Sequence, residues 1–174
     1  MACSITLSGV ALGCADAIGG IKEVFIASYD DVVITAASGV VTAITMQNSA
    51  KFKHYQFRKA TGSLTSTGNI DDAAGTNFVQ SDLVLQFNKY NDTAVRNEIA
   101  ALSVGNLAVI VHTNNNNYVY LGAENPVTAT AVTGQTGTAF ADGSFYQITL
   151  SDFAQAMPLQ VTASLIDATI IDFN

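Results

Sequence analysis

Short apolar segments broken by turn-forming residues are the feature that most limits how this chain can fold. Segments rich in Val, Ile, Thr, Phe and Tyr alternate with clusters of Gly, Asn, Asp and Ser, at intervals of roughly ten residues. This spacing is typical of a β-sandwich or a β-barrel. We therefore expect strands over residues 4–10, 22–29, 32–35, 40–46, 52–57, 63–69, 78–87, 107–112, 118–121, 127–132, 146–150 and 168–173.

The apolar pattern changes from a period of two to a helical period in the middle of the chain. Leu83, Leu85 and Phe87 alternate with polar side chains, as in a strand with one buried face. Beyond a cluster of capping residues, apolar side chains then recur at intervals of three and four residues until Gly105. The sequence thus predicts a mainly β protein, a β-sandwich or barrel with one flanking amphipathic α-helix at about residues 92–104.

Charged residues are scarce for a chain of this length. The chain has 174 residues, of which 49% are apolar and 12% are charged, and that charged share is about half the usual one. No linker and no repeat of fixed period interrupts the sequence, so residues 1–174 are expected to form a single β domain. Because a surface with few charges loses little solvation when a neighbour covers it, the composition favours a subunit of an assembly over a free monomer.

The charges are also unevenly placed along the sequence. The formal net charge is −7, so the chain as a whole is expected to repel nucleic acid. All seven Lys and Arg residues lie at or before Arg96, and only acidic residues carry charge after it. Complementary patches of this kind can orient subunits in a ring.

The basic charge is concentrated in residues 51–59, where Lys and Arg are interleaved with aromatic side chains. Three interpretations are open: a strand that contacts the acidic edge of a neighbouring subunit, a site for single-stranded nucleic acid, and an ordinary solvated strand or loop. The net negative charge favours the first interpretation over nucleic-acid binding. The candidate inter-subunit contacts are Lys51, Lys53, Tyr55, Arg58 and Lys59.

No constellation of residues typical of an active site is found in the sequence. His54 and His112 stand alone, without a nucleophile motif or metal-ligand spacing, and each is interpreted as a strand or surface histidine. The adjacent carboxylates Asp30-Asp31 and Asp71-Asp72 fall in predicted turns, where Asp is favoured for its local hydrogen bonds. A hydrolase that uses these carboxylates is the weakest of three hypotheses. We therefore expect no enzyme, with no catalytic residue, cofactor or metal site.

The N-terminal residues show neither the basic nor the long apolar region of a signal peptide. No apolar run reaches the length of a transmembrane helix. We therefore expect synthesis in the cytosol and no membrane association. In that compartment Cys3 and Cys14 are predicted to be small buried thiols rather than a disulfide framework.

Several segments, taken together, resemble structural proteins of tailed bacteriophages, especially phages that infect gut Bacteroidetes. One is the opening Met-Ala-Cys-Ser-Ile-Thr-Leu-Ser-Gly-Val-Ala-Leu-Gly-Cys, followed by Gly-Gly-Ile-Lys-Glu-Val-Phe-Ile-Ala at 19–27. The others are the run from Lys51 to Ser-Leu-Thr-Ser-Thr at 63–67, Leu-Val-Leu-Gln-Phe at 83–87, the helix with Arg96, Ile99 and Leu102, the hairpin at 107–121, Thr136-Gly137, and Tyr-Gln-Ile-Thr-Leu at 146–150. The resemblance covers most of the chain.

The resemblance to tail tube and tail ring proteins implies a helix-flanked β-sandwich or barrel whose copies join their sheets into rings, commonly hexameric, and stack the rings into a tube. It implies a virion protein of the tail, assembled in the host cytoplasm. Its partners would be other copies of itself, other phage tail proteins, and genomic DNA that passes through the lumen during ejection without specific binding. An acidic lumen would suit that passage.

Two alternatives to a tail tube or ring subunit are kept. Other phage structural proteins, of the neck or associated with the capsid, carry similar sequence features. A lectin-like β-sandwich that binds sugar or protein ligands is the alternative from a different functional class.

Overall fold

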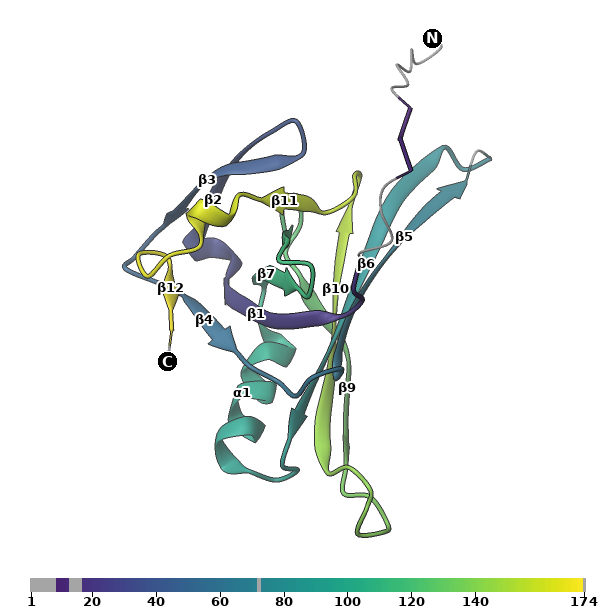
Figure 1. The fold of residues 1–174 in the computed structure, drawn as a ribbon, viewed down its shortest axis with the longest axis vertical. Coiled ribbons are helices and arrows are strands. Elements are labelled where there is room, and N and C mark those ends of the chain that lie inside the picture. The colour runs from purple at the N-terminus through teal and green to yellow at the C-terminus, as the bar shows by residue number, and fades with distance from the viewer. Residues whose placement is uncertain (1–8, 13–16, 72, 174) are drawn as a thin grey trace.

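A computed structural model describes residues 9–12, 17–71 and 73–173 of the chain. In this part the chain is mainly β, with twelve strands in two sheets and one α-helix beside them (Figure 1). The expected fold class is therefore confirmed. The strand expected over residues 4–10 lies largely outside the described residues, and the two residues that are described, Gly9 and Val10, are not in a strand.

Eight strands form the large sheet, in the order β12-β4-β1-β7-β8-β11-β3-β2. Their bounds are Ile21–Ser28 (β1), Val32–Ala37 (β2), Val40–Met46 (β3), Phe52–Tyr55 (β4), Leu107–Thr113 (β7), Tyr118–Leu121 (β8), Leu159–Val161 (β11) and Ile171–Asp172 (β12). The hairpin expected between β2 and β3 is confirmed, and Ser38 and Gly39 adopt the positive φ of 52° and 79° that a two-residue turn of this kind requires. β7 lies inside the sheet with both faces covered, and its first five residues are accordingly an unbroken apolar run.

Four antiparallel strands form the small sheet, in the order β5-β6-β10-β9. Their bounds are Gly62–Asp71 (β5), Thr76–Asn88 (β6), Thr128–Gln135 (β9) and Phe145–Ala154 (β10). β5 and β6 form a long hairpin that extends beyond the other strands (Figure 1). The alternation predicted in β6 is confirmed, because Leu83 and Leu85 are fully buried on one face while Asp82 and Gln86 lie on the other.

The helix α1 spans Thr93–Val104, close to the predicted range. It begins after Asp92, whose side chain accepts hydrogen bonds from two backbone N–H groups of the first turn at 3.1 and 3.4 Å. A cap of this kind stabilises a helix by about 1 kcal/mol. Ile99 and Leu102 are buried and attach the helix to the core, as the apolar stripe predicts.

Two clusters of buried side chains hold the layers together. The first lies between the two sheets and under α1, and it includes Leu83 and Leu150 of the small sheet. The second lies on the opposite face of the large sheet and includes Phe25, Phe52 and Tyr120. Because most members of the second cluster come from strands of the large sheet, that sheet curls around its own core. Removal of this apolar surface from water is the main stabilising contribution to such a fold.

The small sheet is larger than the sequence pattern predicts. β9 continues through residues 133–135 and β10 through residues 152–154, although both stretches have the composition of loops. β10 pairs with β6 along its whole length, up to Ala154 opposite Val79, and this pairing extends the strand. The short strand β11 is not predicted, and the predicted closing strand is reduced to the two residues of β12.

Candidate functional site

The small sheet has two edges without a partner strand. In the described part of the chain, β5 pairs only with β6, and β9 pairs only with β10. Every residue of β9 from Thr130 to Gln135 is exposed, so most of this strand is accessible to solvent. Unpaired edges present rows of free backbone N–H and C=O groups, which are templates for pairing with another chain.

The outer face of the small sheet carries no positive charge. None of its four strands contains Lys or Arg. Helix α1 packs on the opposite, inner face together with the core. The outer face is mostly polar, with amide and hydroxyl side chains on β6 and β10 in alternating positions: Gln80, Gln86, Gln147, Thr149 and Ser151. The small sheet thus presents an open surface that does not attract phosphate.

A carboxylate, Asp82, lies at the centre of this outer face. Its Oδ1 accepts a hydrogen bond from Ser151 Oγ at 2.5 Å, and both of its oxygens accept from Gln80 Nε2 at 3.1 and 3.0 Å. Ser151 Oγ lies 2.9 Å from Thr130 Oγ1 on the edge strand. These contacts link three strands and hold the carboxylate in a fixed position on the open face.

The predicted basic stretch is divided between a strand and a turn. Its first half is β4, which pairs with β1 on one side and with β12 on the other. Lys53 forms an ion pair with Asp172 at 2.6 Å, and Lys51 Nζ donates to the Ala168 carbonyl at 2.5 Å. The C-terminal segment of the same chain therefore engages these two cations, and their predicted role between subunits stays a prediction.

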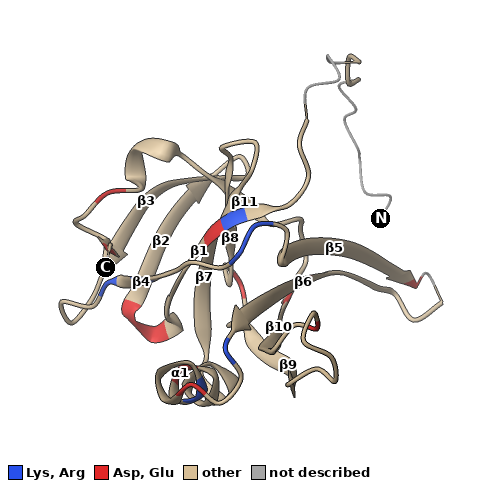
Figure 2. Cartoon of the chain, turned by 60° about the horizontal axis from the view of Figure 1, so that its bottom comes forward, with Lys and Arg blue, Asp and Glu red and all other residues tan. Residues whose placement is uncertain are grey.

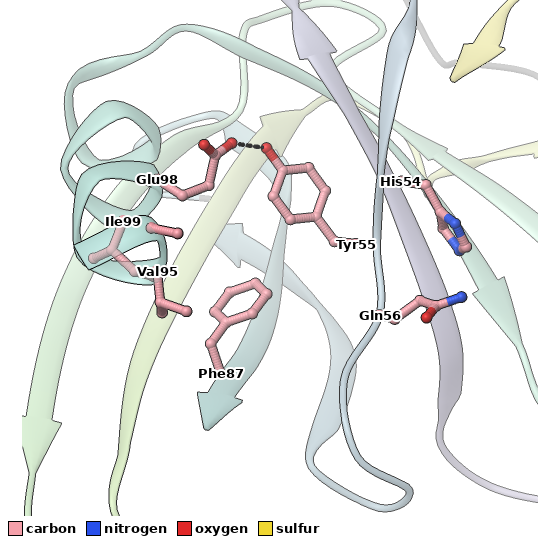
Figure 3. Close-up of a pocket in the computed structure, with 8 residues that line it drawn as sticks. His54, Tyr55, Gln56, Phe87, Val95, Glu98 and Ile99 are labelled. Carbon is pink, nitrogen blue, oxygen red and sulfur yellow. Dashed lines mark hydrogen bonds between the residues drawn. The ribbon is translucent and has the colours of Figure 1, made fainter. Parts of the chain in front are cut away.

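Tyr55 points toward α1, whereas His54 points to the other side of β4 (Figure 3). The Tyr55 hydroxyl donates a hydrogen bond to the Glu98 carboxylate beside a pocket of about 330 Å³, which Phe87 and Val95 help to line. Burial, and after it the hydrogen bond to Glu98, raise the pKa of Tyr55. The tyrosine thus connects β4 to the helix in its neutral form.

Arg58 and Lys59 lie in the turn between β4 and β5, where Thr61 closes the turn by donating to the Arg58 carbonyl. Lys89, just after β6, lines the same groove as Arg58, and Arg96 is on the first turns of α1. All four cationic side chains belong to exposed residues. Among the residues that the structure describes, none offers any of them a hydrogen bond or an ion pair.

Strand register brings together two histidines that lie far apart in the sequence. Glu23 of β1 lies between them, with Oε2 at 2.8 Å from His54 Nε2 and Oε1 at 2.6 Å from His112 Nδ1. The two histidine side chains are only 7% and 6% exposed. Phe25 stacks on His54, and Tyr118 stacks on His112. We call this group the Glu23 cluster. Both histidines lie in strands, as the sequence interpretation allows, but they do not stand alone.

The Glu23 cluster has the character of a buried hydrogen-bonded group. Burial alone would raise the pKa of Glu23, but the hydrogen bonds from His112 and His54 outweigh it, so the pKa lies below its ordinary value. Within the described ranges, no set of three His, Cys, Asp or Glu side chains is arranged to hold a metal ion. The carboxylate therefore orients the two rings and satisfies their N–H groups. Nothing in the spacing of these three residues signals their meeting.

Of the two adjacent carboxylate pairs in the sequence, the structure describes Asp30, Asp31 and Asp71, which lie after β1 and at the end of β5. Asp30 and Asp31 lie in a short 3₁₀ turn after β1, and Asp31 accepts from Asn48 Nδ2 at 2.9 Å. Asp71 ends β5, and its Oδ1 accepts from two following backbone N–H groups at 3.0 Å, while Asp72 lies outside the described residues. Asp31 and Asp71 thus make the local turn contacts expected of Asp.

A further buried carboxylate, Asp152, lies on the inner face of the small sheet and is missed by the sequence interpretation. The residue is 3% exposed, and its Oδ2 accepts from the Gly122 N–H at 3.3 Å. Its Oδ1 is buried without a hydrogen-bond partner in the described part of the chain. Burial raises the pKa of Asp152, and the charge of nearby Glu124 adds to this effect against the hydrogen bond from Gly122.

Neither Cys3 nor Cys14 is among the described residues, so their predicted role as buried thiols stays a prediction. None of the helices in the described ranges combines the length and the apolar character that a membrane crossing demands. Comparison of the chain with protein-family models, with curated proteins and with solved structures gives no match.

Proposed function

We propose that the chain is a structural subunit of a phage tail, a tail tube or tail ring protein that forms closed rings. The observation that carries the proposal is the small sheet, which combines two unpaired edges with an outer face free of Lys and Arg. If β5 of one copy adds to β9 of the next, the free backbone groups of both strands are satisfied.

The strand directions favour this pairing. Because all neighbours in the order β5-β6-β10-β9 are antiparallel, β5 and β9 run in opposite directions within one copy. Adjacent copies in the same orientation would therefore meet as an ordinary antiparallel pair. A contact between two different edges is heterologous, and such contacts close into a ring when the rotation between copies permits it.

The outer face of the small sheet is the surface that we assign to the lumen. Its inner face is covered by the core and α1, so the outer face is the one left for a conduit. DNA passing along it would meet amides, hydroxyls and the fixed carboxylate of Asp82, with no cation to hold a phosphate. The proposal thus accounts for both the open edges and the missing positive charge.

Electron microscopy and sedimentation of the purified chain at high concentration test the proposal. Val132 on β9 is 43% exposed, and V132K places a charge on an edge that would be buried in the ring. Val33 is 47% exposed on β2, the edge strand of the large sheet, so V33K is the matched control. We expect rings from the wild type and V33K but not from V132K. A wild type that stays monomeric, or rings that V132K leaves intact, would contradict the proposal.

A lectin-like binding module is the second candidate, and one observation favours it. Tyr90 stacks on Tyr146 with ring centroids 4.9 Å apart, beside a polar groove formed by the loop after β9. Aromatic rings with adjacent polar groups are common in ligand sites. A glycan-array signal that survives high salt and is lost in Y90A, from a chain that forms no rings, would favour this function over a tail subunit. Rings without stacked tubes would favour a neck or capsid-associated position.

A further inference from the structure

One end of the small sheet is rich in exposed cations. The start of β5, the end of β6 and the start of β10 lie at this end, together with the β9–β10 loop (Figure 1). Blue segments lie on the loop leading to β5, just after β6 and on α1, whereas the tip of β5 is red (Figure 2). We define the cationic end by its four exposed basic residues: Arg58, Lys59, Lys89 and Arg96.

The acidic side chains at the cationic end are engaged by other groups. Asp92 caps α1, and Glu98 accepts a hydrogen bond from Tyr55. Asp142 accepts from two backbone N–H groups of its own loop, both at 2.8 Å. In the described part of the chain none of these carboxylates is within ion-pair distance of the four cations. Hydrogen bonds from neutral groups leave these three carboxylates charged, so the four cations exceed them by one and this end keeps a net positive charge.

The opposite end of the small sheet holds only acidic charge. No Lys or Arg occurs in residues 63–81, 121–130 or 147–157, which form this end. We define the acidic end by Asp71 and Glu124, both of which are exposed. Among the described residues, each accepts hydrogen bonds from backbone N–H groups and from no cation, so each keeps its negative charge available.

The two ends are too far apart to neutralise each other within one copy. β6 has 13 residues, which corresponds to a length of about 40 Å. The Debye length at physiological ionic strength is about 8 Å, so the interaction between the ends of one molecule is screened. Each end can therefore find an oppositely charged partner only on another molecule.

We infer that the partner of each end is a second copy of this chain, with the cationic end of one copy docked on the acidic end of the next. This inference rests on the proposed function, in which it supplies the contact between successive rings. Exposed apolar side chains accompany the charges at both ends. Phe140, in the β9–β10 loop, is fully exposed at the cationic end. At the acidic end Phe78 and Phe153 are partly exposed, and their ring centroids lie 6.2 Å apart.

The docking is directional and open-ended. A contact between two different surfaces on opposite ends of a molecule repeats along one axis and produces a stack. The apolar side chains would supply affinity, while the charges would set the orientation and accelerate association. This separation of roles predicts that stacking depends on salt more strongly than ring closure does, since strand pairing uses backbone groups.

Charge reversal at each end tests the docking with the full chain. R58E/K89E makes both ends acidic, and D71K/E124K makes both ends basic. We expect each variant alone to form rings but to stack at least about tenfold more weakly than the wild type, and a mixture of the two to stack again. K22E and D30K, which change exposed charges in β1 and in the turn after it, are the matched controls and should stack normally. Sedimentation velocity and electron microscopy at about 0.05 and 0.5 M salt measure both steps.

The outcomes separate this inference from the proposed function. Rings that stack equally well in R58E/K89E, or stacking that the mixture does not restore, overturn the end-to-end docking alone. A wild type that stays monomeric at low salt overturns both. Salt-sensitive binding of duplex DNA that R58E/K89E abolishes, without self-association of the wild type, would make nucleic acid the partner of the cationic end and would also overturn the docking.

Discussion

Removal of the Glu23 carboxylate should destabilise the chain more than any change at an exposed acidic residue. Glu23 is the acceptor for both His54 and His112, whose side chains are 7% and 6% exposed. E23A leaves two imidazole groups without a partner in a region where water hardly reaches them. A buried polar group without its hydrogen bond costs about 1–3 kcal/mol. For two such groups, with partial relaxation, we expect a loss of about 2–4 kcal/mol in the free energy of unfolding.

Comparison of E23A with the conservative variant E23Q separates the loss of hydrogen bonds from the loss of the whole side chain. In E23Q one amide oxygen still accepts from one ring, and the amide NH₂ can donate to the other ring in its neutral form. We therefore expect E23Q to lose about 1 kcal/mol, clearly less than E23A. D30A is the matched control, because Asp30 is exposed in its short turn, and it should change stability by less than about 0.5 kcal/mol.

The effect should depend on pH with a definite sign. The hydrogen bonds from the histidines hold the folded-state pKa of Glu23 below its ordinary value of 4.5. The stabilisation is therefore fully present above pH 4.5 and is lost as the pH falls through the folded-state pKa. Urea denaturation of dilute protein, followed by far-ultraviolet circular dichroism at neutral pH and below pH 4.5, measures it. A deficit of E23A below about 0.5 kcal/mol at neutral pH, or one that does not shrink in acid, would refute the reasoning.

Three further predictions concern the two sheets. L83A removes a fully buried side chain from the core between them and should lower the free energy of unfolding by about 2–5 kcal/mol in urea. D152N should raise stability by about 1 kcal/mol at neutral pH, with the gain vanishing in acid, because burial raises the pKa of Asp152 and its ionised form is penalised; a loss at neutral pH would contradict this. In G134A the new Cβ would lie 2.7 Å from Tyr90 and 3.0 Å from Tyr146, so we expect a weakened tyrosine signal in near-ultraviolet circular dichroism and a loss of about 1–3 kcal/mol.

Local patterns were sufficient to predict the elements whose signals lie within one segment. The alternation around Leu83 and Leu85 identified β6, and the capping residue Asp92 with the stripe at Ile99 and Leu102 identified α1. In each case the burial that selects the pattern is repeated every two, three or four residues. The positive φ of a hairpin turn was likewise visible in the Ser-Gly pair at 38–39.

The elements that sequence reasoning missed depend on partners far along the chain. The end of β10, with Ser151 and Asp152, has the composition of a turn and is extended only because β6 continues beside it. The Glu23 cluster depends on the register of β1 with both β4 and β7, which no local pattern specifies. Register between distant strands is set by the packing of the whole core, and a single sequence does not display it.

The edges and the ends of the small sheet are independent surfaces, and a tube requires both. The two edges are the outer sides of β5 and β9, and they offer backbone N–H and C=O groups. The two ends are where the strands start and stop, and they offer charged side chains. The restriction of basic residues to positions 22–96 becomes an end-to-end polarity because the turn before β5 and the end of β6 meet at one end of an antiparallel sheet. V132K should therefore prevent rings without reversing the polarity, and R58E/K89E should leave single rings. A variant of either kind that abolished both steps would mean that one surface serves both contacts, and the two-interface interpretation would be wrong.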